Sequence, residues 1–234
     1  MRAEIRTNPE EAAFARLELL SWYWSSARRF PWREERDPYR ILMAEMMLRR
    51  TRASQVVEVY RSFIAKYPDA AALDSASAAE VAEDLRPLGL YWRAANFKKL
   101  AEELVSRHSG SVPGSREELL QLTGVGPYVA DAVRCFAFVE PVALVDTNTV
   151  RVAARYFGFE YNQESRRRPA VIAAVSELVD TGQPQASNYA LLDFAATVCR
   201  ALNPEHAACP LRSHCRHFQH TTGESEPQER GTEE

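Results

Sequence analysis

Residues 122–128 read Leu-Thr-Gly-Val-Gly-Pro-Tyr and join two segments of helical periodicity, residues 116–122 and 127–139. Two glycines separated by one apolar residue permit a tight hairpin. Its backbone N–H groups, together with the N-terminus of the following helix, can surround an anion such as a phosphate. A plain corner between two helices, with glycine at the C-cap, explains the same residues equally well. The candidate phosphate-binding residues are Gly124, Val125 and Gly126.

Outward from this hairpin, apolar residues recur at intervals of three and four along most of the chain, which predicts helices. One long helix is expected from Asp37-Pro38, as N-cap and first turn, to Tyr67-Pro68. The only candidate strand, residues 139–145, is short. The sequence therefore predicts an all-α fold. The other expected helices cover residues 10–24, 75–85, 90–108, 147–157, 168–179 and 187–198.

Composition is that of an ordinary globular protein, since 46% of the 234 residues are hydrophobic and 26% are charged. No apolar run reaches the roughly 18 residues that a membrane span needs, and the N-terminus lacks an apolar signal core. We therefore expect a cytoplasmic protein, associated with a bacterial or archaeal nucleoid if it binds DNA, and no membrane partner.

The net charge of −3 conceals an uneven distribution. Residues 219–234 contain five Glu and one Arg, so the remainder carries 28 basic and 27 acidic residues. This polar, aperiodic tail is predicted to be disordered. The basic clusters elsewhere permit nucleic-acid binding without requiring it, because each one also fits a solvated helix face. They are Arg28–Arg29, Arg49–Arg50–Arg52, Lys98–Lys99 and Arg166–Arg168.

Glu45 is the one acidic residue within the apolar run Ile41–Leu48. Burial of a carboxylate is costly, so its pKa would rise and suit it to act as an acid. The alternative is an i,i+4 ion pair with Arg49 on an exposed face.

Asp146 lies in Val145-Asp146-Thr147-Asn148, immediately before a predicted helix. Its position is that of an N-cap. A carboxylate held in this way by helix N–H groups also suits an anion that faces a developing positive charge, so the two roles can coexist.

Cysteines bunch near the C-terminus in the pattern Cys199-x6-His206-x2-Cys209-x5-Cys215. In a chain without a signal peptide, this compact spacing indicates a metal site rather than disulfides. Cys135 lies apart, on the helix after the hairpin, where it is expected to be a buried small apolar residue.

In their order along the chain, these motifs resemble the helix-hairpin-helix DNA glycosylase superfamily. That superfamily contains endonuclease III and the adenine and mismatch-thymine glycosylases. The resemblance runs from about Phe30 to Cys215 and implies two helical domains with the active site in the cleft between them. The implied domains are a six-helix barrel at 28–138, a cluster domain at 1–27 with 139–218, and the tail at 219–234. The motifs that carry it are FPWREERDPYRILMAEMMLRRT, LGLYWRAANFKKLAEEL, LTGVGPYVADAV, VDTNTVRV and the cysteine loop.

The resemblance also implies roles for individual residues. Asp146 would stabilise the oxocarbenium-like sugar or orient the attacking water. The hairpin would hold a phosphate beside a nucleotide extruded from the duplex. Leu90 would enter the stack that the base has left. The residues that could contact the opposite strand are Arg49, Arg50 and Arg52.

Tyr128 indicates the subclass. Relatives that also cleave the strand place a lysine at this position to form a Schiff base, so tyrosine implies a monofunctional enzyme without β-lyase activity. Tyrosine here, and Arg49-Arg50 where adenine enzymes carry Gln-Gln, are typical of the thymine branch. The 19 residues after Cys215 are also too few for the extra domain of adenine enzymes. Glu45 matches the glutamate that protonates adenine; with a pyrimidine it would position water or contact a carbonyl.

His206 departs from the family pattern, because relatives have a second cysteine there and bind a 4Fe-4S cluster. Three alternatives remain: a 4Fe-4S cluster with Cys3His ligation, a loop without metal, and a Cys3His zinc site. His214 is a weaker ligand candidate because using it would break the family spacing.

The function implied is a monofunctional DNA glycosylase that removes thymine or uracil opposite guanine from double-stranded DNA, acting as a monomer. One alternative keeps the fold and excises a purine, either adenine opposite guanine or oxidised guanine, or hypoxanthine. Glu45 favours it, because purine excision benefits from an acid. Another alternative is a catalytically silent DNA-binding lesion sensor, with His206 as a first sign of decay.

Overall fold

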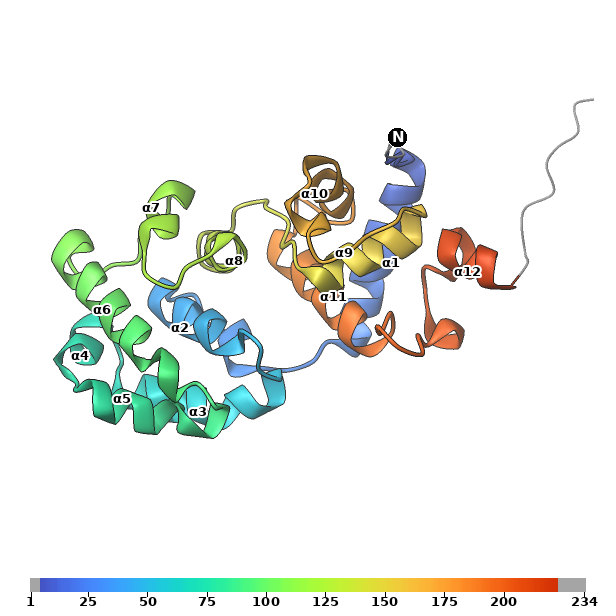
Figure 1. Ribbon diagram of the computed structural model, residues 1–234. Coiled ribbons are helices and arrows are strands. Elements are labelled where there is room, and N and C mark those ends of the chain that lie inside the picture. The colour runs from blue at the N-terminus through green and yellow to red at the C-terminus, as the bar shows by residue number, and fades with distance from the viewer. Residues whose placement is uncertain (1–4, 223–234) are drawn as a thin grey trace, which may run out of the picture. The chain divides into compact units, whose positions relative to one another are not determined.

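Helices and 3-10 turns form all the regular structure of residues 5–222, the part of the chain that this computed structural model describes. Within those residues no strand is present, and 139–145 form an irregular connection (Figure 1). The all-α prediction is confirmed. No helix in the described part of the chain is long and apolar enough to span a membrane.

The chain divides into two units, one of residues 28–144 and one that joins the residues up to Ala27 with those from Val145 onward. The predicted barrel ended at 138, whereas the first unit also includes the connection 139–144. Leu144 is fully buried, and Glu140 forms an ion pair with Arg134 of the preceding helix, which holds this connection on the first unit.

In the first unit, helix α2 (Pro38–Leu48) is the central element and packs against α3 and α8. Every residue from Ile41 to Met47 is buried. Helix α6 packs against α4 and α5 on the other side of the unit (Figure 1). The remaining bounds are α3 (Ala53–Lys66), α4 (Ala70–Ser75), α5 (Ala78–Leu85), α6 (Ala94–His108), α7 (Arg116–Gln121) and α8 (Pro127–Phe138), with 3-10 turns at Pro31–Arg33, Arg86–Leu88 and Tyr91–Arg93.

The long helix expected from residue 38 to 67 is in fact two helices, α2 and α3. Its start is as predicted, because the Asp37 side chain accepts hydrogen bonds from the N–H groups of Tyr39 and Arg40. The break falls at Arg50, which adopts a left-handed φ of 63°. Residues 49–52 are all polar, and the apolar pattern resumes with Ala53 and Val56, a gap short enough to be taken for the exposed face of one continuous helix.

The second unit is built around helices α1 (Pro9–Ser26) and α9 (Thr147–Phe157). Helix α1 packs against α11, and α9 packs against α10, α11 and α12. The Tyr156 hydroxyl donates to the Glu11 carbonyl at 2.7 Å, and Arg216 pairs with the Glu11 carboxylate at 2.7 Å. The N-terminal helix is thereby tied to the C-terminal part of the chain. The other bounds are α10 (Pro169–Ser176), α11 (Pro184–Thr197) and α12 (Arg216–Thr222), with 3-10 turns at Ser165–Arg167, His206–Ala208 and Arg212–His214.

The acidic tail that was predicted to be disordered was expected to begin at residue 219. Residues 219–222 belong to helix α12, so the prediction is wrong for them. Residues 223–234 lie outside the described residues.

Candidate active site

The turn between α7 and α8 is a tight hairpin anchored by two buried side chains, Leu122 and Val125. Gly124 has a φ of +82°, and a Cβ added there would meet the Met46 Cε at 2.7 Å. Glycine is therefore favoured by its left-handed conformation, whereas the Met46 methyl group is the end of a flexible side chain that can shift. The Gly126 N-cap of α8 has no side-chain cap, so the first turn of this helix keeps its affinity for an anion.

Two of the hairpin's backbone donors are already used. The Thr123 N–H donates to the Glu103 carboxylate at 2.7 Å, and the Val125 N–H donates to the Leu122 carbonyl at 3.1 Å. At a phosphate site, Val125 would therefore anchor the hairpin rather than donate, and the expected hairpin donors reduce to the N–H groups of Gly124 and Gly126.

Arg49, at the end of α2, is hydrogen-bonded to the hairpin, and Arg93 is hydrogen-bonded to Arg49. Arg49 Nη1 donates to the Gly124 carbonyl at 2.6 Å, and Arg93 Nη1 donates to the Arg49 carbonyl at 3.0 Å. Arg93 is buried, and its pKa is lowered by burial and then by the charges of Arg49 and Arg50. The side chains of Arg49, Arg50 and Arg52 are exposed. Positive charge thus gathers beside the hairpin.

Glu45 lies in the buried run of α2 and is 4% exposed. Its Oε2 is buried and has no hydrogen-bond partner among the described residues. Burial raises the pKa of Glu45 to about 7, although the Arg33 charge opposes the rise. The predicted i,i+4 alternative is wrong, because Arg49 turns to Gly124 instead. Glu45 is therefore a carboxyl group that can hold or release a proton near neutral pH.

Tyr128 is the second residue of α8, directly after the hairpin, and is partly exposed. Its side chain is a phenol, whereas the lysine expected at this position in strand-cleaving relatives would supply an amine for a Schiff base.

Asp146 is the N-cap of α9, as predicted. Its Oδ1 accepts from the N–H groups of Asn148 and Thr149 at 2.7 and 2.8 Å, and its Oδ2 accepts from the Asn148 side chain at 2.7 Å. The Asp146 N–H in turn donates to Thr149 Oγ1 at 3.0 Å. These bonds fix the orientation of the carboxylate.

The Asn148 side chain, which donates to the Asp146 carboxylate, itself accepts a hydrogen bond from Arg151. Arg151 Nη1 donates to the Asn148 Oδ1 at 2.9 Å. Its Nε and Nη2 donate to the carbonyls of Cys199 and Ala195 at 3.0 and 2.8 Å. A continuous hydrogen-bonded path therefore connects Asp146 with the start of the cysteine loop, all within the second unit.

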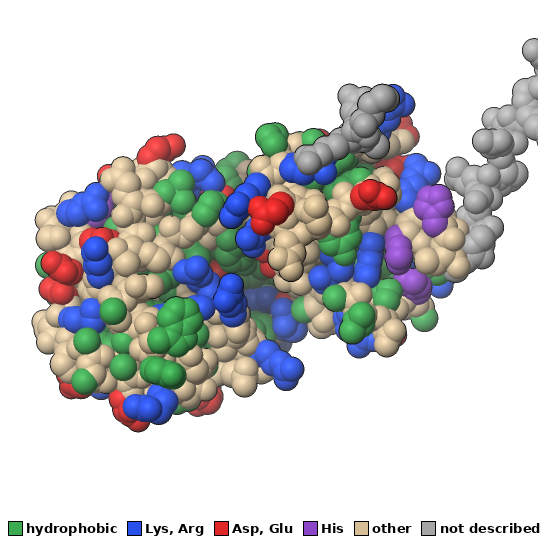
Figure 2. All heavy atoms as spheres, viewed as in Figure 1, with side chains coloured by type: hydrophobic (Ala, Val, Ile, Leu, Met, Phe, Trp, Pro, Cys, Tyr) green, Lys and Arg blue, Asp and Glu red, His purple; other side chains and the backbone are tan. Residues whose placement is uncertain are grey.

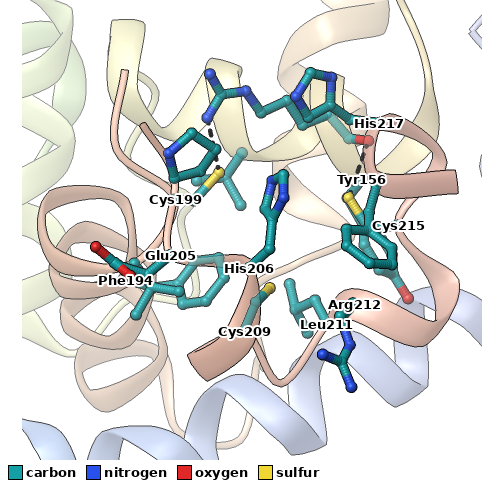
Figure 3. A pocket seen from close by; sticks show the side chains of 15 residues that line it. Tyr156, Phe194, Cys199, Glu205, His206, Cys209, Leu211, Arg212, Cys215 and His217 are labelled. Carbon is teal, nitrogen blue, oxygen red and sulfur yellow. Dashed lines mark hydrogen bonds between the residues drawn. The ribbon is translucent and has the colours of Figure 1, made fainter. Parts of the chain in front are cut away.

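Cys199, His206, Cys209 and Cys215 line one pocket together with His217. Figure 3 shows the His206 ring projecting into the space that the cysteines surround. Burial raises the pKa of Cys209 to about 11. Cys199, Cys209 and Cys215 form no disulfides. Cys135 is fully buried, as expected.

Comparison with known proteins identifies the family. The model of the HhH-GPD superfamily base excision DNA repair protein matches residues 43–175. A thymine/uracil-DNA glycosylase of Methanothermobacter thermautotrophicus is 36% identical over 215 residues, covering 91% of this chain and 96% of the relative. The chain belongs to the HhH-GPD superfamily. It is a base-excision DNA glycosylase.

Two further similarities bear on this glycosylase. The solved structure of a thermostable thymine-DNA glycosylase matches with a TM-score of 0.86 at 34% identity, covering 90% of this chain and 98% of that one. An adenine DNA glycosylase of Mycolicibacterium smegmatis is 37% identical over 201 residues, covering 86% of this chain and 68% of the relative. The second relative thus extends well beyond the matched part.

Members of this family carry 4Fe-4S clusters, and the pocket of the cysteine loop is where such a cluster would be held. No three His, Cys, Asp or Glu side chains in the described part of the chain converge closely enough to hold one metal ion. A 4Fe-4S cluster takes its protein ligands around a core larger than a single ion, and Cys199, His206, Cys209 and Cys215 lie around one pocket.

Sequence reasoning missed three side chains that hold the candidate residues in place. Arg93 and Arg151 are buried cations whose bonds go to backbone carbonyls distant in sequence, and such bonds leave no motif. Asn148 could have been found, because it lies two residues after Asp146 in the first helical turn. Leu90 is only 4% exposed, so it would have to leave the core to enter a base stack, and its role stays a prediction.

Proposed function

We propose that this glycosylase hydrolyses the N-glycosidic bond of thymine or uracil mispaired with guanine, leaving an abasic site in an intact strand. Tyr128 carries the proposal, because a phenol at the start of α8 cannot form the Schiff base that strand cleavage requires. The names of the thymine- and thymine/uracil-specific relatives, which match most of this chain, support the same substrate.

Asp146 would supply the main electrostatic contribution to catalysis. As the base leaves, the sugar acquires oxocarbenium character and positive charge. A carboxylate whose orientation is already fixed by Asn148 and Thr149 can stabilise that charge without reorganising. The same carboxylate can instead orient the attacking water, and either role requires it to be ionised.

Glu45 would act on the leaving base. With a pKa near 7 it is partly protonated at neutral pH and can donate a hydrogen bond to a pyrimidine carbonyl. The same property supports a second candidate function, excision of a purine, which benefits from a proton donor. The similarity to adenine DNA glycosylases favours this alternative as well.

The partner would be double-stranded DNA with a mismatched base. The phosphate next to the extruded nucleotide would lie against the Gly124–Gly126 hairpin and the N-terminus of α8, with Arg49 and Arg50 beside it. We propose that the protein acts as a monomer, which light scattering with and without DNA can check.

A 4Fe-4S cluster would be held by Cys199, His206, Cys209 and Cys215. When bound, it would fasten the C-terminal loop and carry a potential that the histidine ligand raises. Analysis of iron, acid-labile sulfide and zinc in the purified protein distinguishes this cluster from zinc and from an empty loop. A His206→Cys variant that retains iron but shifts the reduction potential downward would support ligation by His206.

The function is tested on a panel of labelled duplexes containing G:T, G:U, A:G, A opposite oxidised guanine, and hypoxanthine. Products are read before and after treatment with alkali. Cleavage at G:T or G:U that depends on alkali is the expected result. Cleavage only at a purine would favour the alternative base, and binding without cleavage anywhere would favour a lesion sensor.

A further inference from the structure

The turn that leads into α6 exposes two adjacent aromatic side chains. Tyr91 is 54% exposed and Trp92 is 60% exposed, whereas Leu90 before them is 4% exposed. Gly89, with a φ of 66°, sets the direction of this turn. Leu90, the side chain predicted to enter DNA, is therefore buried, whereas Tyr91 and Trp92 face solvent.

Trp92 is held in a defined position rather than left loose. The Arg93 guanidinium lies over its ring, 4.5 Å from the centroid. Arg93 is itself buried and anchored to the Arg49 carbonyl at 3.0 Å. One face of the indole is thus covered by a fixed cation, and the exposed fraction belongs to the rest of the ring. A rigid, open aromatic face is suited to stacking.

The charges around this aromatic pair favour a polyanion over an apolar partner. Arg93 connects Trp92 to Arg49, and Arg49 reaches the hairpin at the Gly124 carbonyl, 2.6 Å away. In the part of the chain that the structure describes, Arg49, Arg50 and Arg93 form no ion pair with a carboxylate. Phosphates would compensate these cations, and a protein surface would first have to bury them.

We propose that Trp92, with Tyr91 beside it, stacks on a nucleobase of bound DNA next to the position from which a nucleotide has been extruded. This inference rests on the proposed function, since an interrupted stack is what makes a base face available. Aromatic side chains stack on any base, so the contact would strengthen binding without reading the sequence. The Arg93 cation behind the indole would strengthen stacking on an electron-rich base.

The test compares Trp92→Ala, Trp92→Leu and Trp92→Phe, each combined with Asp146→Asn so that bound DNA is not converted. Trp24→Ala is the matched control, because Trp24 is 67% exposed but lies on the other unit. The dissociation constant is measured by anisotropy for a G:T duplex and for the same duplex fully paired. One stacked base contributes about a 5- to 150-fold change in affinity.

We expect Trp92→Ala to weaken binding to the G:T duplex by about that factor, and to weaken binding to the paired duplex less. Trp92→Phe should restore most of the affinity, whereas Trp92→Leu should not, since leucine supplies apolar area without a π face. Trp24→Ala should bind as the parent does. Circular dichroism checks that each variant is folded.

A second readout reports the stacking directly. DNA should quench tryptophan emission in the parent and in Trp24→Ala but not in Trp92→Phe. Equal affinities and equal quenching for the parent and all Trp92 variants would overturn the proposal. A protein that binds mismatched DNA through Trp92 but excises no base would overturn the proposed function and leave the stacking contact standing. A protein that does not bind DNA would overturn both.

Discussion

Replacement of Glu45 by glutamine should change how stability depends on pH. The carboxyl is 4% exposed, and its pKa rises from 4.5 to about 7 in the folded protein because burial disfavours the charged form. Between these two values the unfolded chain releases a proton that the folded protein keeps. The contribution of Glu45 to the free energy of unfolding is therefore largest below pH 4.5, decreases as the pH rises, and is lost above pH 7.

The size of this effect follows from the displacement of the pKa. A change from 4.5 to about 7, at 1.36 kcal/mol per pKa unit, corresponds to ~3 kcal/mol. Glutamine has nearly the same shape but does not ionise. Because Oε2 has no partner, the new amide N–H groups would be unpaired, which costs about 1–3 kcal/mol at every pH. The pH dependence, rather than the absolute stability, is therefore the quantity to compare.

The pH dependence of the free energy of unfolding is measured by urea denaturation at pH values from about 4 to 8.5, with circular dichroism as the signal. The stability of Glu45→Gln minus that of the wild type should increase by about 3 kcal/mol across this interval. Glu102→Gln, at an exposed position of α6, is the control and should show no such increase. Parallel curves for the wild type and Glu45→Gln would refute the assignment of a buried, proton-holding carboxyl.

Three other substitutions test the hairpin, the Asp146 support and the subclass. Gly124→Ala should destabilise the protein by about 1–2 kcal/mol, because alanine disfavours the left-handed φ. Gly126→Ala, whose new Cβ meets nothing within 4 Å, should be tolerated. Equal urea midpoints for the two variants would contradict this account. Asn148→Ala removes one hydrogen bond to the Asp146 carboxylate. The variant should lower the single-turnover rate of base release by about tenfold and leave the affinity for DNA unchanged. An unchanged rate would show that this hydrogen bond is dispensable. Tyr128→Lys should cleave DNA without alkali and form a Schiff base with the DNA that borohydride traps. Tyr128→Ser should neither cleave DNA nor be trapped. Absence of trapping by the lysine variant would argue against Tyr128 lying at the reacting sugar.

Much of the fold is predictable because it depends on local rules. Two helix starts follow from a carboxylate that accepts hydrogen bonds from the next residues, Asp37 for α2 and Asp146 for α9. The hairpin follows from Gly124, which adopts a left-handed φ without strain. The division of the long helix into α2 and α3 was not predictable in this way. It depends on the conformation of Arg50, a residue whose type gives no sign of a left-handed φ.

The site was only partly predictable, because its support comes from distant parts of the chain. Glu45 could be recognised as buried from its apolar neighbours, but the choice of Arg49 between Glu45 and the Gly124 carbonyl depends on tertiary structure. The bonds from Arg151 reach backbone atoms 44 and 48 residues away. Backbone acceptors carry no residue-type signal, so no spacing pattern could reveal them.

The chemical identity of the released base tests the central claim most directly. The purified protein is incubated with a G:T duplex, and the low-molecular-weight fraction is analysed by mass spectrometry, with Asp146→Asn in parallel. The account predicts free thymine from the wild type, an unbroken strand until alkali is added, and no thymine from Asp146→Asn despite normal DNA binding. Thymine released equally by both proteins, or none released by the wild type from G:T or G:U duplexes, would contradict it.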